Sequence, residues 1–375
     1  MTLPWGVRKP VRRARNRARQ AAVLLAQTQR WREIAAAPPV TEELAVSYGY
    51  DRMPGPDEVV YGGGVKFQVM NERLPNRPRA FNVLYLGSTN LPLEASFLVR
   101  LARRRGAAFV WNQNGVAYPG WHGPGWELVN EPRARLLHAA DHVFFQSAFC
   151  KLGADRFYGE RVGPWEVLYN PVDLTRFSPP ASKPARPLTL LLAGSQYQRY
   201  RVVVALETFA ALRHAGDDVR LLVTGALSFG DDAAEDTRRL VQRLQLEDVV
   251  EFTGPYTQDE APAVYARGDI LLHTKYNDPC PTVVLEAMAS GLPIAFSASG
   301  GTPELVGETA GVGVPAPLDW ERDHPPEASE LAAAVRTIAA RLDDYAAAAR
   351  ERAHAFDVNQ WVARHREVFE QLVRR

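Results

Sequence analysis

The sequence contains only two cysteines, Cys150 and Cys280, among its 375 residues. They stand too far apart to belong to a short metal-binding motif, and two cysteines cannot build the disulfide framework of a small secreted domain. The HExxH pattern and the Cys/His spacings of zinc sites are also missing. We therefore expect a protein of a reducing compartment that has no metal site.

Long hydrophobic runs are missing as well. No apolar stretch approaches the ~20 residues that span a bilayer, and the longest early run, Ala21–Ala26, is too short for the core of a signal peptide. The apolar share of 46% and the charged share of 23% are those of a globular protein. We expect a cytoplasmic protein that is long enough for two domains, each with its own core.

Acidic residues are absent from residues 1–32, which hold nine Lys and Arg residues. A helix is predicted over residues 11–36, with arginines on one side and a weak, mostly alanine stripe on the other. Three interpretations stay open: association of residues 8–36 with an anionic membrane surface, an organellar transit peptide, and a solvated or docked helix. In the first case the cytoplasmic protein would be peripheral to a membrane.

From residue 80 onwards, short apolar runs alternate with helical segments. This alternation predicts an α/β fold of parallel sheets covered by helices. The proline-rich residues 171–187 predict a linker between two doubly wound, Rossmann-like domains that face a cleft. The expected strands are residues 82–86, 108–111, 142–145, 166–169, 188–192, 219–223, 249–252, 270–272 and 294–296. The expected parts are a basic N-terminal helix (1–40), two domains (41–180 and 181–350) and a C-terminal helix (351–375).

The most informative segment is DPCPTVVLE, which runs from Asp278 to Glu286 and continues as AMASGLPIAFSASGGTPELV. Pro279 and Pro281 forbid an earlier helix and the residues after them favour one, so a helix is predicted to begin at Thr282. The free N–H groups and partial positive charge of a helix start suit a diphosphate. Glu286 lies on the same helix face as Thr282, where its carboxylate can accept hydrogen bonds from two ribose hydroxyls.

This segment resembles the donor-site signature of glycosyltransferase family 4, retaining enzymes of the GT-B fold. The family pattern is a glutamate, seven residues and a second glutamate. Glu286 matches the second glutamate, whereas Asp278 replaces the first and is one methylene shorter. The resemblance covers roughly residues 60–375 and is stronger after Asn170. It implies an acceptor-binding first domain, a donor-nucleotide second domain and a C-terminal helix that packs back on the first domain.

The resemblance also implies which residues surround the donor. Two cations hold the diphosphate in the family, but Ser195 and Tyr200 occupy those two positions here. The positive charge then has to come from Arg199, Arg201 or Lys275. A glycine-rich loop, a segment whose backbone faces the base, and the GGTPELV turn complete the site. The donor-binding candidates are Gly63, Gly64, Gly194, Ser195, Arg199, Arg201, Thr253, Gly254, Lys275, Thr282, Val283, Glu286 and Gly301.

Three residues are candidates for catalysis: Asp278, His122 and Asn114. Asp278 is expected to hold hydroxyls of the transferred sugar. In the family a histidine near residues 111–126 hydrogen-bonds to that sugar, and either Asn114 or His122 can take its place here. The aromatic residues of this loop fit stacking on sugar faces or simple loop packing.

The resemblance implies a retaining, metal-independent glycosyltransferase. It would move a hexose-type sugar from a UDP-, GDP- or ADP-sugar to a glycan, lipid-linked or small-molecule acceptor, with no further cofactor and no nucleic-acid partner. No Asp-x-Asp triplet, the metal-binding signature of the other main glycosyltransferase fold, is present. The departures at Asp278, Ser195 and Tyr200 leave open a GT-B protein that binds sugar nucleotides as a scaffold without turnover. A sugar-nucleotide epimerase fits the motif order less well.

Overall fold

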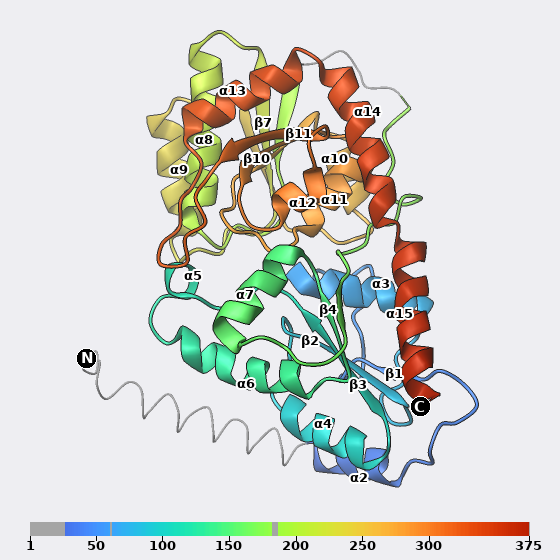
Figure 1. Ribbon diagram of the computed structural model, residues 1–375. Coiled ribbons are helices and arrows are strands. Elements are labelled where there is room, and N and C mark those ends of the chain that lie inside the picture. The colour runs from blue at the N-terminus through green and yellow to red at the C-terminus, as the bar shows by residue number, and fades with distance from the viewer. Residues whose placement is uncertain (1–26, 61, 182–186, 375) are drawn as a thin grey trace.

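The structure is a computed structural model that describes residues 27–60, 62–181 and 187–374. It has two α/β lobes, one above the other in Figure 1. Most of the basic segment expected to form a helix over residues 11–36 lies outside the described residues, and its described end is helix α2, Thr28–Ala36. In the described part of the chain, no helix combines the length and apolar character that crossing a bilayer requires.

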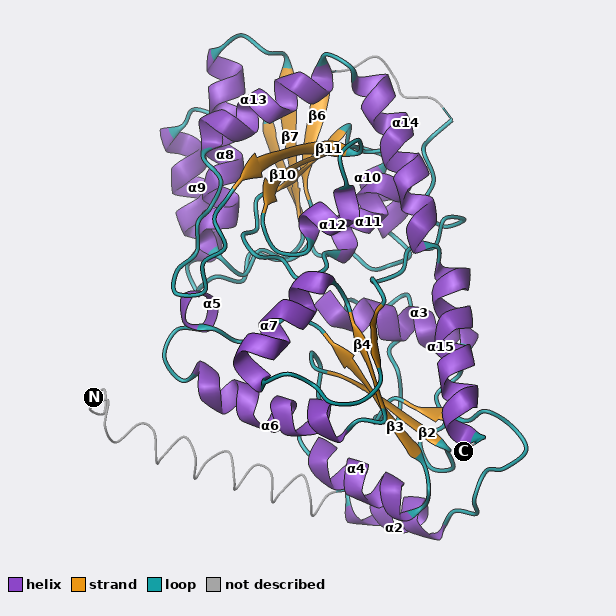
Figure 2. Cartoon of the chain, in the orientation of Figure 1, coloured by secondary structure: helices purple, strands orange, loops and turns teal. Residues whose placement is uncertain are grey.

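The first lobe is built on a five-stranded parallel sheet. Its elements are β1 (Val46–Ser47), η1 (Gly62–Gly64), α3 (Val65–Arg73), β2 (Val83–Gly87), α4 (Ala95–Arg104), β3 (Ala108–Gln113), α5 (Pro119–His122), α6 (Trp126–Ala139), β4 (His142–Phe145), α7 (Ala148–Tyr158) and β5 (Trp165–Val167). The strands lie in the order β1-β2-β3-β4-β5. Helices α4, α6 and α7 cover one face of this sheet (Figure 2).

The second lobe is built on a six-stranded parallel sheet. Its elements are β6 (Leu188–Leu192), α8 (Arg199–His214), β7 (Val219–Thr224), α9 (Ala233–Arg243), β8 (Val250–Gly254), α10 (Ala261–Tyr265), β9 (Ile270–His273), α11 (Thr282–Ala289), β10 (Ile294–Ala298), α12 (Thr302–Val306), β11 (Gly311–Pro315), α13 (Ala328–Ala339) and α14 (Leu342–Ala353). The strand order is β11-β10-β9-β6-β7-β8. Helices α8, α9 and α13 cover one face, and α11, α12 and α14 cover the other.

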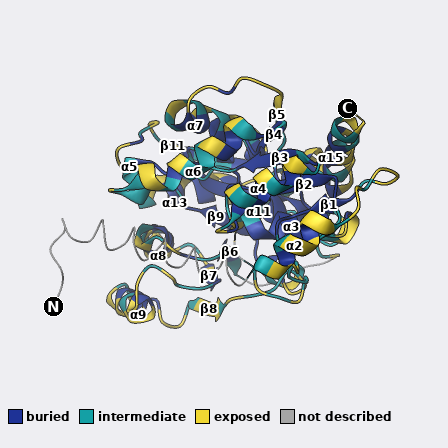
Figure 3. Cartoon of the chain, turned by 90° about the horizontal axis from the view of Figure 1, so that it is seen from below, coloured by how far each residue is buried: buried dark blue, intermediate teal, exposed yellow. Residues whose placement is uncertain are grey.

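The inner strands are apolar on both faces because helices cover both sides of each sheet, whereas most residues of the edge strand β8 are exposed. In β2, Leu84 and Leu86 point into the core beneath α4 and α6, whereas Val83 and Tyr85 point into the core on the opposite face. All four are fully or almost fully buried. Figure 3 shows the buried strands in the middle and the exposed positions on the outer faces of the helices.

The chain ends on the first lobe. After η2 (His354–Phe356), helix α15 (Val358–Val373) packs with Trp361 and Phe369 against the face of the first sheet that also carries α3. The His365 Nε2 atom lies 2.9 Å from the hydroxyl of Tyr85. Burial lowers the pKa of His365 to about 3, so the ring is neutral at pH 7. Because α15 follows the second-lobe helix α14 in the chain and packs on the first sheet, the C-terminal segment joins the two lobes.

The expected architecture of two Rossmann-like, parallel α/β lobes is confirmed, and all nine expected strands are present. Two further strands were not predicted. β1 has only two residues, which is too short to stand out as an apolar run. β11 reads GVGVP, and its glycines and proline weaken the pattern of a strand.

Candidate active site between the two lobes

A cavity of about 570 Å³ lies between the lobes, at the carboxyl ends of strands from both sheets. In the second sheet the order reverses between β6 and β9, so the loops after these two strands diverge and leave a crevice. Ten of the sequence-predicted site residues line this cavity: Gly63, Asn114, Gly194, Ser195, Arg201, Lys275, Asp278, Thr282, Val283 and Glu286.

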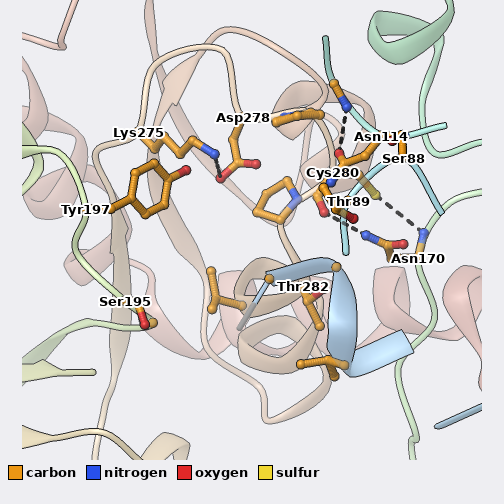
Figure 4. Close-up of a pocket in the computed structure, with 18 of the residues that line it drawn as sticks. Ser88, Thr89, Asn114, Asn170, Ser195, Tyr197, Lys275, Asp278, Cys280 and Thr282 are labelled. Carbon is orange, nitrogen blue, oxygen red and sulfur yellow. Dashed lines mark hydrogen bonds and ion pairs between the residues drawn. The ribbon is translucent and has the colours of Figure 1, made fainter. Parts of the chain in front are cut away.

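Asp278 is an ionised carboxylate held in an ion pair (Figure 4). Its Oδ2 atom lies 3.2 Å from Lys275 Nζ and 3.4 Å from His273 Nε2. Burial acts to raise the pKa of Asp278, but the charge of Lys275 and the contact with His273 outweigh it and hold that pKa well below its usual range. Burial lowers the pKa of His273, so Lys275 supplies the positive charge at neutral pH.

The backbone before Asp278 is strained. Asn277 has a φ of 50°, in the left-handed region that asparagine tolerates better than most residues. Its N–H donates to Ser299 Oγ at 2.8 Å, and the Gly301 N–H donates to the Asp278 carbonyl at 2.8 Å. These bonds fix the direction of the Asp278 side chain. Sequence reasoning missed Asn277, although an asparagine in a turn is a known signal of this conformation.

Helix α11 begins at Thr282, as predicted. No side chain in the described part of the chain caps its first turn, and Pro281, Thr282 and Val283 line the cavity, so the free N–H groups of this turn lie at the cavity wall. The end of β6 comes close to this turn at Gly194, which has a φ of 79°. A Cβ added at Gly194 would lie 3.0 Å from Val283 Cγ1, so a larger residue would crowd the helix start.

Glu286 is a buried carboxyl that forms no ion pair with any of the described residues. Its side chain accepts hydrogen bonds from the Tyr265 hydroxyl at 2.7 Å and from Gln258 Nε2 at 3.1 Å. Burial raises the pKa of Glu286 to about 7, against the lowering effect of these two bonds. The sequence predicted Glu286 but not its two partners. Gln258 lies in the loop between β8 and α10 and Tyr265 at the end of α10, and neither position was recognised as part of the site.

Two cations of the second lobe gather on one aromatic ring. The Arg201 guanidinium carbon lies 5.3 Å and Lys275 Nζ 5.2 Å from the centre of the Tyr197 ring. Arg201 Nη1 also donates to the Ser195 carbonyl at 2.9 Å. The negative face of an aromatic ring stabilises nearby cations. Tyr197, which also lines the cavity, was not among the predicted residues.

Arg199 does not line the cavity. It forms an ion pair with Asp236 on α9, and more than half of its side chain is exposed. Its position does not support a role at the diphosphate, because the first turn of α8 points it toward α9. Tyr200, at the position of the family lysine, has a packing role instead: its hydroxyl accepts a hydrogen bond from the Tyr276 N–H at 3.0 Å.

Five other predicted residues also lie outside the lining. These are Gly64, His122, Thr253, Gly254 and Gly301. His122 sits on the short helix α5, where its ring contacts the Gly123 carbonyl at 3.3 Å. Thr253 is exposed at the end of the edge strand β8. Gly301 lies behind Asp278, where an added Cβ would meet the Pro279 carbonyl oxygen at 2.0 Å.

The first lobe contributes polar groups from the loops after β2 and β3. The Asn114 N–H donates to Ser88 Oγ at 2.9 Å, and both residues line the cavity. Thr89 Oγ1 and the Tyr158 hydroxyl also belong to residues of the lining, and neither has a hydrogen-bond partner among the described residues. Both atoms are buried, so they are unsatisfied polar groups within the wall of the first lobe. Within the described ranges, no cluster of three or more His, Cys, Asp or Glu side chains is arranged to hold a metal ion.

Comparison with known proteins places this site in a family context. Residues 175–322, less than half of the chain, match the family model described as glycosyl transferases group 1. The chain is 32% identical over 142 residues to a putative colanic acid biosynthesis glycosyltransferase, WcaL, of Escherichia coli, which covers 36% of this chain and 34% of that protein. It is 32% identical over 180 residues to a D-inositol 3-phosphate glycosyltransferase of Salinispora tropica, covering 42% and 37%. The chain thus spans about a third of the length of these curated relatives.

The fold resembles solved structures along most of the chain. Sucrose-phosphate synthase from Thermosynechococcus elongatus has a TM-score of 0.64 and 22% identity, covering 82% of this chain and 76% of its own. Anabaena Alr3699/HepE in complex with UDP-glucose has a TM-score of 0.64 and 20% identity, covering 78% and 79%. The chain therefore has the two-lobed GT-B fold, and its residues 175–322 match glycosyl transferases group 1.

Proposed function

We propose that this chain is a glycosyltransferase that binds a sugar nucleotide in the cavity between its lobes. One observation carries the proposal: the start of α11, two cations and two carboxyls, supplied by residues 275–286 and by Arg201 of α8, line a single cavity. A sugar nucleotide needs this combination, because it joins a diphosphate to two groups rich in hydroxyls. The match of residues 175–322 to glycosyl transferases group 1 supports the same conclusion.

The donor would lie along the second lobe. The first turn of α11, Arg201 and Lys275 would hold the diphosphate, since N–H groups and cations both stabilise phosphate oxygens. Glu286 would accept hydrogen bonds from ribose hydroxyls, and Asp278 would accept them from the transferred hexose. HepE was solved with UDP and UDP-glucose, so a uridine diphosphate sugar is the first donor to test, followed by GDP- and ADP-sugars.

The reaction would retain the configuration at the anomeric carbon. Asp278 is tied into an ion pair with Lys275, which makes it a poor nucleophile. The acceptor oxygen would then attack on the face from which the diphosphate leaves, and the acceptor proton would pass to a diphosphate oxygen. The helix start and the two cations would stabilise the leaving charge, so the proposed reaction uses no metal ion.

The acceptor would enter along the first lobe, near Asn114 and Ser88. A glycan, a lipid-linked saccharide or a small molecule carrying a hydroxyl group could serve. The relative named for colanic acid biosynthesis favours a polysaccharide or glycolipid pathway. We also propose that the basic residues 8–36 associate with an anionic membrane surface, which would bring the enzyme to lipid-linked acceptors.

Saturation-transfer NMR against UDP-, GDP-, ADP- and dTDP-sugars tests the proposal. We expect one nucleotide class to bind the wild-type protein and to lose most of its signal in Glu286→Ala. The exposed Glu235→Ala on α9 serves as the matched control and should bind normally. Absence of binding by every sugar nucleotide would contradict the proposed function.

A second candidate function is a sugar-nucleotide-binding scaffold without turnover. Asp278 in place of the first family glutamate, and Ser195 and Tyr200 in place of the family cations, favour it. The recruitment of Lys275 and Arg201 to the cavity argues against it, because positive charge is restored there from other positions. Donor binding without transfer or hydrolysis, across a broad acceptor panel, would establish the scaffold.

A further inference from the structure

The loop between β11 and α13 leaves the second lobe and docks on the first (Figure 1). We call residues 316–327 the strap. The Trp320 carbonyl accepts a hydrogen bond from the Gly120 N–H of α5 at 2.9 Å. The Trp320 ring is only 7% exposed and belongs to the hydrophobic core of the first lobe. A residue of the second lobe thus completes the packing of the first.

The Trp320 indole lies within a group of aromatic rings of the first lobe. Its centre is 5.0 Å from that of Tyr118, 5.2 Å from that of Phe149 and 5.3 Å from that of Phe157. The contact with Phe149 is stacked, with 17° between the ring planes. A Cβ added at Gly153 would lie 3.4 Å from the indole, so the ring packs directly against this position of α7.

The other side of the strap is attached to the segment that carries Asp278. The Tyr276 hydroxyl donates to the Pro317 carbonyl at 2.6 Å and accepts from the Asp319 N–H at 2.8 Å. Asn277 Nδ2 donates to the Asp319 carbonyl at 3.2 Å. The strap therefore links the candidate sugar-binding carboxylate of the second lobe to the aromatic wall of the first.

This aromatic wall faces the cavity. Tyr118, Trp121, Phe149 and Trp320 are all part of its lining. The cavity lining also contains the polar side chains of Ser88, Thr89 and Asn114 from the first lobe. Aromatic rings next to polar side chains suit a ligand that has both an apolar C–H face and hydroxyls at its edge. A pyranose ring has this character, whereas a lipid chain lacks the hydroxyls.

We propose that Trp320 is a positioning residue for the acceptor: carried by the strap, it completes and orders an aromatic subsite for a pyranose ring of a saccharide acceptor. The inference rests on the proposed function, because it identifies the class of acceptor for the same cavity. The subsite is complete only while the second lobe holds Trp320 between Tyr118 and Phe149. Acceptor recognition is thereby coupled to the segment that presents Asp278.

Saturation-transfer NMR on the full chain in the presence of UDP tests this inference. The ligands are the methyl α-pyranosides of glucose, galactose, mannose and N-acetylglucosamine, with D-sorbitol as a polyol that lacks a ring face. At least one pyranoside should receive saturation and sorbitol should not. Trp320→Leu should lower the pyranoside signal about fivefold, the size expected when an aromatic contact is lost, and leave the UDP signal unchanged.

Two further variants keep the test decisive. Trp320→Phe retains an apolar ring and should lose about half of the pyranoside signal, so it decides the question if Trp320→Leu does not fold. Trp165→Leu removes an exposed tryptophan of β5 that does not line the cavity, and it should behave as wild type. Equal pyranoside signals in wild type and the folded Trp320 variants, or no pyranoside signal in wild type, would overturn the inference. If UDP received no saturation from the wild-type protein, the result would instead contradict the proposed function.

Discussion

At the scale of single residues, the two carboxyls of the site are in opposite electrostatic states. Asp278 is ionised because Lys275 and His273 outweigh the effect of burial, whereas burial outweighs the hydrogen bonds and the charge of Arg176 at Glu286 and raises its pKa to about 7. A donor that supplies ribose hydroxyls to Glu286 would favour its ionised form. Glu286 would then lose a proton when the donor binds below neutral pH.

The affinity for UDP-glucose should therefore rise with pH. Below pH 7 the free protein holds a proton on Glu286 that the ligand must displace, and above pH 7 it does not. We expect about tenfold tighter binding at pH 7.5 than at pH 5.5, measured by isothermal titration calorimetry. Glu286→Gln cannot titrate and should bind weakly with little pH dependence. An unchanged pH dependence in that variant would show that another group titrates.

The second prediction concerns the cations Arg201 and Lys275, and Arg199, on the same helix as Arg201, provides the control. Arg201→Met and Lys275→Met should each weaken UDP-glucose binding about tenfold, because each removes a charged contact with the diphosphate. Arg199→Met, two residues before Arg201, should change it little, since Arg199 pairs with Asp236 outside the cavity. Calorimetry on the three variants decides the matter. Equal losses in all three would point to a general effect of surface charge.

The sequence predicted most residues of the second-lobe site but fewer of their surroundings. Glu286, Asp278 and Thr282 stand in one continuous motif, so their spacing alone places them on a loop and the helix after it. Tyr197 of the β6–α8 loop, and Gln258 and Tyr265 of the β8–α10 region, join them only through tertiary packing, which no local pattern records. Arg199 and Arg201 could not be told apart, because the direction of each side chain depends on where α8 begins.

At the scale of elements, the site depends on how closely the end of β6 approaches the start of α11. Gly194 allows this approach through a positive φ and the absence of a Cβ. The reversal of strand order between β6 and β9 brings the two loops to one crevice. The nine predicted strands were visible as apolar runs, whereas β1 and β11 form only because neighbouring strands pair with them.

Substitution of Gly194 separates backbone strain from crowding of the helix start. Gly194→Ala should lower stability by about 1 kcal/mol, the cost of a left-handed residue with a Cβ, and should also weaken UDP-glucose binding. Gly216→Ala is the control, because Gly216 has a φ of 87° and open space around its Cβ position. Thermal unfolding should show similar losses for both variants. Normal nucleotide binding by Gly194→Ala would argue against the α11 start as the phosphate site.

At the scale of the whole molecule, several contacts hold the lobes together around the cavity. The Glu304 carboxylate on α12 accepts the N–H groups of Ala148 and Phe149 at 2.8 and 2.9 Å, at the start of α7 in the first lobe. It also accepts from the Tyr169 hydroxyl at 3.0 Å. A carboxylate at a helix start is favourable. The GGTPELV turn was expected to complete the donor site, and its glutamate, Glu304, forms this contact between the lobes.

Glu304→Ala should weaken the contact that holds the two lobes together at the start of α7. The loss of a carboxylate from the start of α7 should cost about 1–2 kcal/mol and shift the lobes toward an open form. Small-angle X-ray scattering should detect a larger radius of gyration than in wild type. Glu308→Ala, an exposed position just beyond α12, serves as the control. An identical scattering profile for Glu304→Ala and wild type would mean that the other contacts suffice.

Glycosyl transfer itself tests the central claim most directly. Wild-type protein and Asp278→Asn should be incubated with UDP-α-D-glucose, and with the donor class found by binding if it differs, in the presence of a saccharide panel. Proton NMR then follows the anomeric signals over time. The account predicts a new α-glycoside, or α-glucose from transfer to water, formed by wild type and strongly reduced in Asp278→Asn. Donor that binds but stays intact, or a β-configured product, would contradict a retaining glycosyltransferase.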